Sequence, residues 1–283
     1  FQAGAAGKRE KVYILGAEDE TGMKVKNYRG YLLDLDGTIY RGNEAIPGAA
    51  VFLRHLKQEQ IPYLFLTNNA AVTPRQVAEK LQNMGIDAAQ EEVYTSAMAT
   101  AQYLRERAEA GTRVYVIGED GLREEILKAG FVLDEKQPHY VIVGIDRSFT
   151  YDKLAIASRA VRNGAVLIAT NSDAAVPREN GLFPGAGSLV AAVSVASAAK
   201  PVVVGKPEPI IVGYALQKLG VSAQETLIVG DNLHTDIEAG VKSGIDSLLV
   251  LTGYSTAEEA ASSPIRPTHV ARDLFEWLGR IGG

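Results

Sequence analysis

Two aspartates, two residues apart, are the residues in this sequence most suited to chemistry. Asp34 and Asp36 follow the apolar run Tyr31–Leu33 and precede Gly37. Because alternate side chains of an extended chain point the same way, we expect both carboxylates on one side of a strand end. Neighbouring carboxylates repel each other, so the pair requires a cation or a shared proton. The pattern predicts metal-assisted chemistry, with one carboxylate as nucleophile and the other as acid and base.

The same residues allow two other interpretations. Asp-x-Asp-Gly also begins some calcium-binding loops, but an EF-hand loop needs Gly at its sixth position and Glu at its twelfth. Counted from Asp34, those positions hold Ile39 and Ala45, so the calcium loop is excluded. A plain acidic turn after a strand remains the alternative, and the rest of the chain must decide between it and a functional site.

Composition narrows the class of protein. The chain has 283 residues, 46% of them hydrophobic and 22% charged, which is typical of a soluble globular protein of one or two domains. A net charge of −5 gives no basic footprint for nucleic acid. Cysteine is absent from the sequence, which excludes disulfides and thiolate sites and fits a cytoplasmic location. The longest weakly polar stretch, residues 187–199, is too short to span a bilayer, so we expect no membrane partner.

Strand and helix patterns alternate along the chain. Thr73 and Pro74 are a cap and a first helical residue. Short apolar runs predict strands at residues 31–33, 62–66, 114–117, 140–143, 166–169, 202–204, 227–229 and 248–251. Apolar strands that alternate with helices predict a doubly wound α/β fold, whose parallel sheet binds ligands at the carboxyl ends of its strands.

Polar residues follow four of these runs and should meet at one edge of the sheet. They are Asp34 and Asp36, the segment 67–69 (Thr-Asn-Asn), Lys206, and Asp231 with Asp236. The long interval between the second and third groups predicts an inserted domain. We expect a discontinuous core domain at residues 23–87 and 200–283, and an α/β cap domain at 88–199. Residues 1–22 look like a leader from a tag or linker, with Met23 as the natural start.

The four groups resemble, in order, the motifs of the haloacid dehalogenase (HAD) superfamily of phosphohydrolases. The resemblance extends from Met23 to the C-terminus and is closest to the NagD-like class IIA, which carries an α/β cap. The stretches that carry it are Asp34–Thr38, Leu66–Asn69, Gly205–Pro207, Gly230–Asp236, Tyr40–Gly42, Pro47–Ala49, Thr170–Asp173 and Pro184–Ser188. The resemblance implies a Rossmann-like HAD core with the cap inserted in mid-chain.

The resemblance also implies roles for the catalytic residues. Mg²⁺ would be held by the carboxylate of Asp34, the backbone carbonyl of Asp36 and the carboxylate of Asp231. Asp34 would attack phosphorus and form an aspartyl phosphate. Asp36 would protonate the leaving oxygen and then activate the hydrolytic water.

Other residues would bind the phosphoryl group or support this set. Thr67 and Asn68 would donate hydrogen bonds to phosphoryl oxygens, and Lys206 would supply a fixed positive charge. Asn232 and Asp236 would lie around the metal site. Asp236 would orient Lys206 or a water, or else cap the helix that follows. The cap residues expected to contact substrate are Asn171, Asp173 and Arg178.

The sequence thus predicts a Mg²⁺-dependent phosphatase of small phosphorylated metabolites, such as sugar phosphates, nucleotides or aryl phosphates. A large cap argues against protein substrates, and we expect a monomer or homodimer. One alternative is a phosphotransferase that uses a sugar acceptor. Another is a phospho-ligand sensor without catalysis, which would not need a nucleophile. A dinucleotide-binding domain is excluded because the first strand–helix turn lacks Gly-x-Gly-x-x-Gly.

Overall fold

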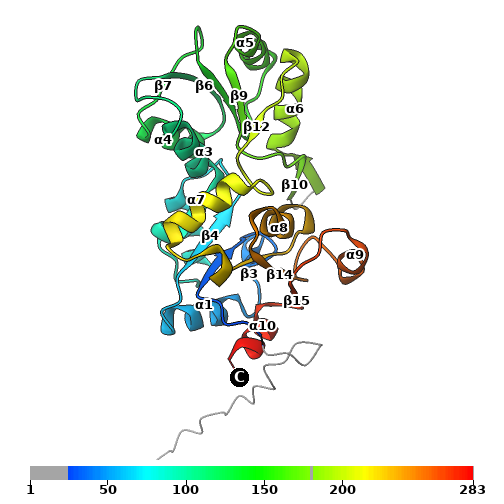
Figure 1. The fold of residues 1–283 in the computed structure, drawn as a ribbon. Coiled ribbons are helices and arrows are strands. Elements are labelled where there is room, and N and C mark those ends of the chain that lie inside the picture. Colours follow the sequence, from blue (N-terminus) through cyan, green and yellow to red (C-terminus); the bar gives the residue numbers. More distant parts are fainter. Residues whose placement is uncertain (1–24, 179–180, 283) are drawn as a thin grey trace, which may run out of the picture.

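The computed structural model describes residues 25–178 and 181–282, arranged as two α/β units stacked end to end (Figure 1). The expected leader, residues 1–22, lies outside the described residues. One unit holds a six-stranded parallel sheet with the order β15-β14-β13-β1-β4-β5. Its strands are β1 (Gly30–Leu33), β4 (Tyr63–Thr67), β5 (Val93–Thr95), β13 (Thr226–Gly230), β14 (Asp246–Val250) and β15 (His269–Ala271).

Helices cover both faces of this sheet, as predicted. Because side chains alternate along β1, Tyr31 and Leu33 pack in one apolar cluster and Leu32 packs in the other. The first cluster includes α1 (Ala49–Gln58), α2 (Pro74–Asn83) and α10 (Leu274–Ile281); the second includes α3 (Ser96–Arg105), α7 (Pro209–Leu219) and α8 (Glu238–Ser243). Helix α2 begins where the sequence predicted, with the Thr73 hydroxyl accepting a hydrogen bond from the backbone N–H of Gln76.

The second unit holds a five-stranded parallel sheet with the order β12-β9-β8-β6-β7. Its elements are β6 (Arg113–Ile117), α4 (Asp120–Lys128), β7 (Val132–Leu133), β8 (Tyr140–Val143), α5 (Tyr151–Arg162), β9 (Val166–Ala169), α6 (Ala186–Ser197) and β12 (Val202–Val203). Segments after β6 and β9 contact the loop that follows β4. Gly121 N–H donates to the carbonyl of Ala71, and the Asn171 side chain donates to the carbonyl of Asn68. The carboxyl ends of both sheets therefore face the junction between the units.

Near both expected domain boundaries, one strand belongs to the sheet of the other unit. β5 pairs with β4 and belongs to the six-stranded sheet, although it lies after residue 88. β12 pairs with β9 and belongs to the five-stranded sheet, although it lies after residue 199. The strand before Lys206 therefore pairs in the five-stranded sheet and not in the sheet that contains β1. A short β-branched run fits either sheet edge, and its periodicity does not say which.

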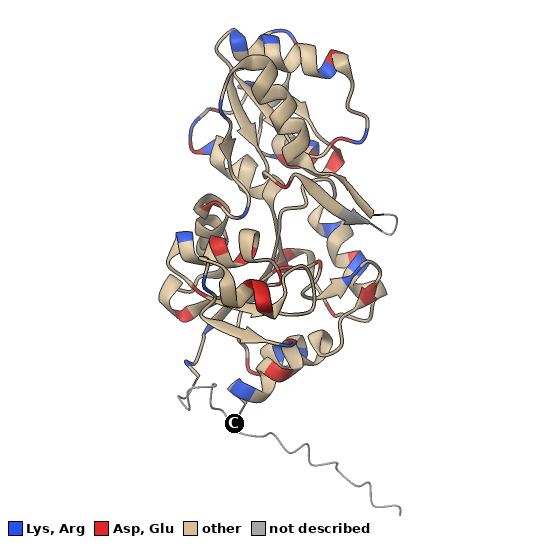
Figure 2. Ribbon diagram, turned by 90° about the vertical axis from the view of Figure 1, so that its right-hand side faces the viewer, with Lys and Arg blue, Asp and Glu red and all other residues tan. Residues whose placement is uncertain are grey.

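The distribution of charged residues and the lengths of the helices are two further features of the fold. Acidic and basic residues are interspersed over both units (Figure 2). Among the described residues, no helix is long and apolar enough to cross a membrane. The short helix α9 (Ala257–Ser262) follows β14 and packs through Ala260 on Leu249 of that strand.

Candidate active site

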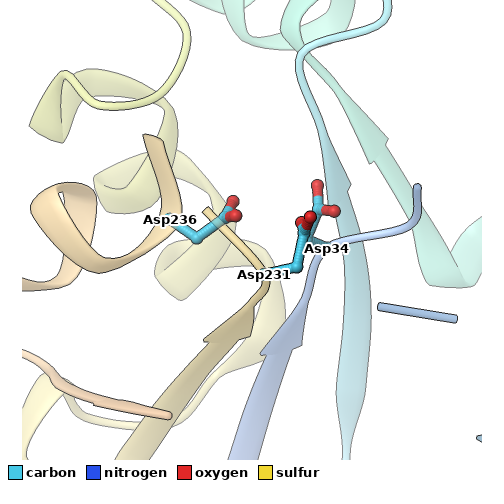
Figure 3. Close-up of side chains that lie close together, drawn as sticks. All are labelled: Asp34, Asp231 and Asp236. Carbon is cyan, nitrogen blue, oxygen red and sulfur yellow. The ribbon is translucent and has the colours of Figure 1, made fainter. Parts of the chain in front are cut away.

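Three carboxylates meet at the carboxyl ends of β1 and β13. Asp34 directly follows β1, Asp231 directly follows β13, and Asp236 lies in a π-helical turn, Leu233–Ile237 (Figure 3). Each of the three offers an oxygen that lies within 4.8 Å of the other two. The first and fourth polar groups, which the sequence places at one edge of the sheet, thus lie together, and the cluster includes the carboxylate of Asp236.

The third polar group also reaches this cluster. Lys206 is buried, and its Nζ lies 2.6 Å from Oδ1 of Asp34, 2.6 Å from Oδ1 of Asp236 and 2.9 Å from the carbonyl of Leu66. Burial alone would lower the pKa of Lys206, but the carboxylates of Asp236 and Asp34 outweigh it and raise that pKa. Lys206 is therefore held as a fixed positive charge between two carboxylates.

One lysine does not balance three carboxylates. Burial raises the pKa of Asp34 well above its ordinary value, against the effect of Lys206, and the charges of Asp236 and Asp231 add to the rise. Burial and the charge of Asp236 raise the pKa of Asp231 to about 7. The site thus favours added positive charge. Its crowded carboxylate oxygens fit a hard cation such as Mg²⁺, which takes oxygen ligands.

The loop after β14 holds Asp231 in place, and sequence reasoning missed it. Tyr254 N–H donates to Oδ2 of Asp231 at 2.6 Å, and Ser255 N–H donates to its carbonyl at 3.0 Å. A Cβ added to Gly253 would lie 1.9 Å from Oδ2 of Asp231, and one added to Gly37 would lie 2.3 Å from it. Gly37 also has φ +86°, a conformation that favours glycine. The available signal was the Thr-Gly-Tyr sequence directly after an apolar strand.

Replacement of Gly253 tests whether this close approach positions Asp231. In Gly253→Ala the new methyl group must displace the carboxylate, so we expect Mg²⁺ affinity to fall about 10–100-fold, as for other groups that orient metal ligands. Titration calorimetry with Mg²⁺ on the substrate-free protein measures this directly. Gly279→Ala in α10 is the matched control, because its Cβ would meet nothing within 4 Å. Equal Mg²⁺ affinity in the two variants would contradict the assignment.

The side chain of Asp36 lies outside the carboxylate cluster. β1 ends at Leu33, so Asp36 lies beyond the strand, and its carboxylate is not one of the three in the cluster. That the carboxylates of Asp34 and Asp36 face the same space stays a prediction. Asp36 instead forms a backbone bridge with Tyr40 in the hairpin of β2 (Tyr40–Arg41) and β3 (Glu44–Ala45). Asp36 is exposed as a residue, yet partial desolvation raises the pKa of its carboxyl against the effects of Lys80, Gly42 N–H and Arg41.

The second polar group joins the two units. The Asn68 side chain donates to the carbonyl of Lys206 at 2.9 Å and to Oδ2 of Asp173 at 3.1 Å. Its Oδ1 accepts from the backbone N–H of Lys206 at 2.8 Å. Thr67 Oγ1 accepts from Asn69 N–H at 3.1 Å. The side-chain amide of Asn68 is thus engaged with protein groups, and the phosphate-binding roles of Thr67 and Asn68 stay predictions.

The structure places two of the three expected substrate residues of the second unit beside Asn68. Asn171 is buried, donates to the carbonyl of Asn68 at 2.8 Å and accepts from Asp173 N–H at 3.1 Å. Burial raises the pKa of Asp173 although the Asn68 amide opposes the rise. The backbone of Arg178 pairs with Gly181 in the hairpin of β10 (Ala175–Arg178) and β11 (Gly181–Pro184), and its side chain lies outside the described part.

Asn232 supports the turn that carries Asp236. Its Oδ1 accepts from His234 N–H at 2.9 Å, and its own backbone N–H donates to Oδ2 of Asp236 at 3.2 Å. The π-helical turn thereby aims Asp236 back toward Lys206. The wider turn of a π-helix is common at functional sites.

Comparisons with known proteins agree with this geometry. Residues 31–132 match a family model described as haloacid dehalogenase-like hydrolase, and residues 203–277 match a HAD-hydrolase-like model. The chain is 48% identical to 5'-nucleotidase YutF of Bacillus subtilis over 91% of this chain and 100% of that protein. It is 45% identical to the acid sugar phosphatase of Staphylococcus aureus over 91% of this chain and 99% of that protein.

Solved structures give the same result. A thermostable NPPase double mutant from Geobacillus stearothermophilus has a TM-score of 0.84 and 46% identity, covering 89% of this chain and 99% of that one. NagD from Escherichia coli K-12 has a TM-score of 0.84 and 40% identity, covering 89% of this chain and 98% of that one. This chain therefore belongs to the haloacid dehalogenase-like hydrolases, in their NagD-like class, and is a phosphatase of that family.

Proposed function

We propose that this protein is a Mg²⁺-dependent phosphatase that cleaves phosphate monoesters of small metabolites through an aspartyl-phosphate intermediate. The observation that carries the proposal is the cluster of Asp34, Asp231 and Asp236 around the buried ammonium of Lys206. Relatives named as a 5'-nucleotidase and an acid sugar phosphatase support nucleotides and sugar phosphates as the substrate class. We propose the second unit as the cap that closes over this site, roughly as predicted for residues 88–199.

The residues divide the chemistry between them. Asp34 attacks phosphorus in line, because its carboxylate is at the strand end and faces the space shared with Lys206. Asp36 protonates the leaving oxygen and then takes a proton from the attacking water. Thr67 and the backbone N–H of Asn68 would bind phosphoryl oxygens, together with the charge of Lys206. Held by Asp34, Asp231 and the carbonyl of Asp36, Mg²⁺ would offset the negative charge of the phosphate dianion.

A cap explains how such a site selects substrates. The core residues contact only the phosphoryl group, which all candidate substrates share, so discrimination must come from groups that meet the rest of the molecule. The hydrogen bonds of Asn171 and Asp173 to Asn68 place the loop after β9 against the core. We propose that Asp173 and Arg178 contact substrate, and that Asn171 holds this loop in place. Closure of the cap would also exclude water.

Phosphate release over a panel of sugar phosphates, nucleoside monophosphates and aryl phosphates tests the proposal. We expect release with Mg²⁺, none in excess chelator, and recovery when Mg²⁺ is restored. Ca²⁺ should support release poorly, because it takes more ligands at longer distances than Mg²⁺. Full turnover in excess chelator would contradict the proposed metal site. Transfer to an added sugar without free phosphate would indicate a phosphotransferase, and binding without release would indicate a sensor.

A further inference from the structure

Lys80 on α2 lies beside the proposed site and forms no ion pair with any described residue. Lys80, Lys153 and Lys206 are the described lysines that do not fall among the exposed residues, and the other two are ion-paired. Within the described residues no carboxylate lies within 4 Å of the Lys80 ammonium, which instead lies 3.9 Å from the centroid of the Tyr40 ring. Lysine is rarely withdrawn from water without a partner, so this position needs a reason.

The ammonium lies near Asp36. Tyr40, on whose ring Lys80 lies, is the residue that forms the backbone bridge with Asp36. The electrostatic influence is mutual, since the charge of each residue acts on the pKa of the other. Arg41 also acts on Asp36, but its guanidinium donates to the carbonyl of Thr252. Within the described part of the chain the Lys80 ammonium has no hydrogen-bond acceptor, so its three donors are available.

The leaving group must enter this space. A general acid has to come within hydrogen-bond reach of the oxygen that it protonates. If Asp36 is that acid, the carbon attached to the ester oxygen lies beside Asp36, and its substituents come within reach of the flexible Lys80 side chain. This step rests on the function proposed above, in particular on the role of Asp36.

We propose that Lys80 is a specificity-determining residue that favours leaving groups with an anionic oxygen close to the ester, such as a carboxylate on the neighbouring carbon. The ammonium would exchange its contact with the Tyr40 ring for a charge-assisted hydrogen bond to that oxygen. Such a bond is stronger than a cation–π contact at a partly exposed site, so the exchange is favourable. Neutral leaving groups would leave Lys80 on the ring.

A matched pair of substrates separates this role from a structural one. 2-Phosphoglycerate and glycerol 2-phosphate have the same carbon skeleton. On the ester carbon, the first has a carboxylate where the second has a hydroxymethyl group. In Lys80→Met we expect kcat/KM for 2-phosphoglycerate to fall about 10–100-fold, the size of a hydrogen bond to a charged group. Glycerol 2-phosphate should change less than about threefold, within the effect of a cation–π contact. Lys80→Arg should retain part of the preference.

The controls make each outcome decisive. Arg75→Met removes one positive charge from the exposed face of the same helix, where Arg75 pairs with Glu79, and should leave both substrates unchanged. Equal losses on both substrates in Lys80→Met, or no loss on 2-phosphoglycerate, would overturn the specificity role and leave a contact that only holds the β2–β3 hairpin. Hydrolysis of 4-nitrophenyl phosphate by the wild type tests the proposed function separately. If wild type cleaves none of the three esters, the proposed function itself fails.

Discussion

Asp34→Asn should abolish turnover while the protein stays folded. An amide cannot attack phosphorus to form the acyl phosphate, so the variant lacks the proposed nucleophile. The fold should survive, because the substitution preserves shape and removes one of three carboxylates that crowd together within 4.8 Å. Lys206 keeps its bond to Asp236, so its ammonium is not left unpaired. Single-turnover phosphate release and thermal unfolding measure the two effects.

The matched control for Asp34→Asn is Asp87→Asn. Asp87 is an exposed carboxylate that pairs with Lys57 on the surface and lies outside the predicted motifs. It should retain wild-type turnover, which shows that loss of one acidic charge does not itself inactivate the protein. If Asp34→Asn kept turnover within about tenfold of wild type, another group would be the nucleophile. Loss of a general base alone costs more than about tenfold, so loss of the nucleophile should cost at least as much.

Asp36→Asn should lower kcat by about 10²–10⁴-fold on alkyl phosphates, the usual contribution of a general acid–base residue. Asp36 is an exposed residue, and partial desolvation raises the pKa of its carboxyl. The loss should be smaller for 4-nitrophenyl phosphate, because nitrophenolate leaves without a proton. The ratio of kcat for the two substrates in wild type and variant is the measurement.

Two outcomes would change the assignment of Asp36. An equal loss on alkyl and nitrophenyl esters would mean that Asp36 supports the site in another way, for example through its bridge to Tyr40. Inactive Asp36→Asn together with active Asp34→Asn would mean that the two roles are reversed. The position of Asp36 outside the carboxylate cluster favours the roles as proposed, since a nucleophile must face the bound phosphoryl group.

The sequence alone determined which residues gather at the site, for a local reason. Asp34, Thr67 and Asp231 each follow their own apolar run, and parallel strands place their carboxyl ends at one edge of a sheet. The direction of each side chain was harder to predict from the sequence. Asp36 lies outside the carboxylate cluster, after β1 has ended at Leu33, and the neighbouring Gly37 passes close to Asp231, a residue far away in the sequence.

Only the tertiary structure decided how these residues are held. Lys206 reaches the cluster from a segment that leaves the other sheet, where β12 pairs with β9, and Asn68 bridges that segment to Asp173. The loop after β14 fixes Asp231, because Tyr254 N–H donates to its carboxylate and Gly253 has no Cβ to collide with it. Hydrophobic periodicity reports which face of an element is buried but not which partner buries it, so contacts between distant segments have no local signal. The sequence therefore names the chemical groups, and packing between sheets and loops sets their geometry.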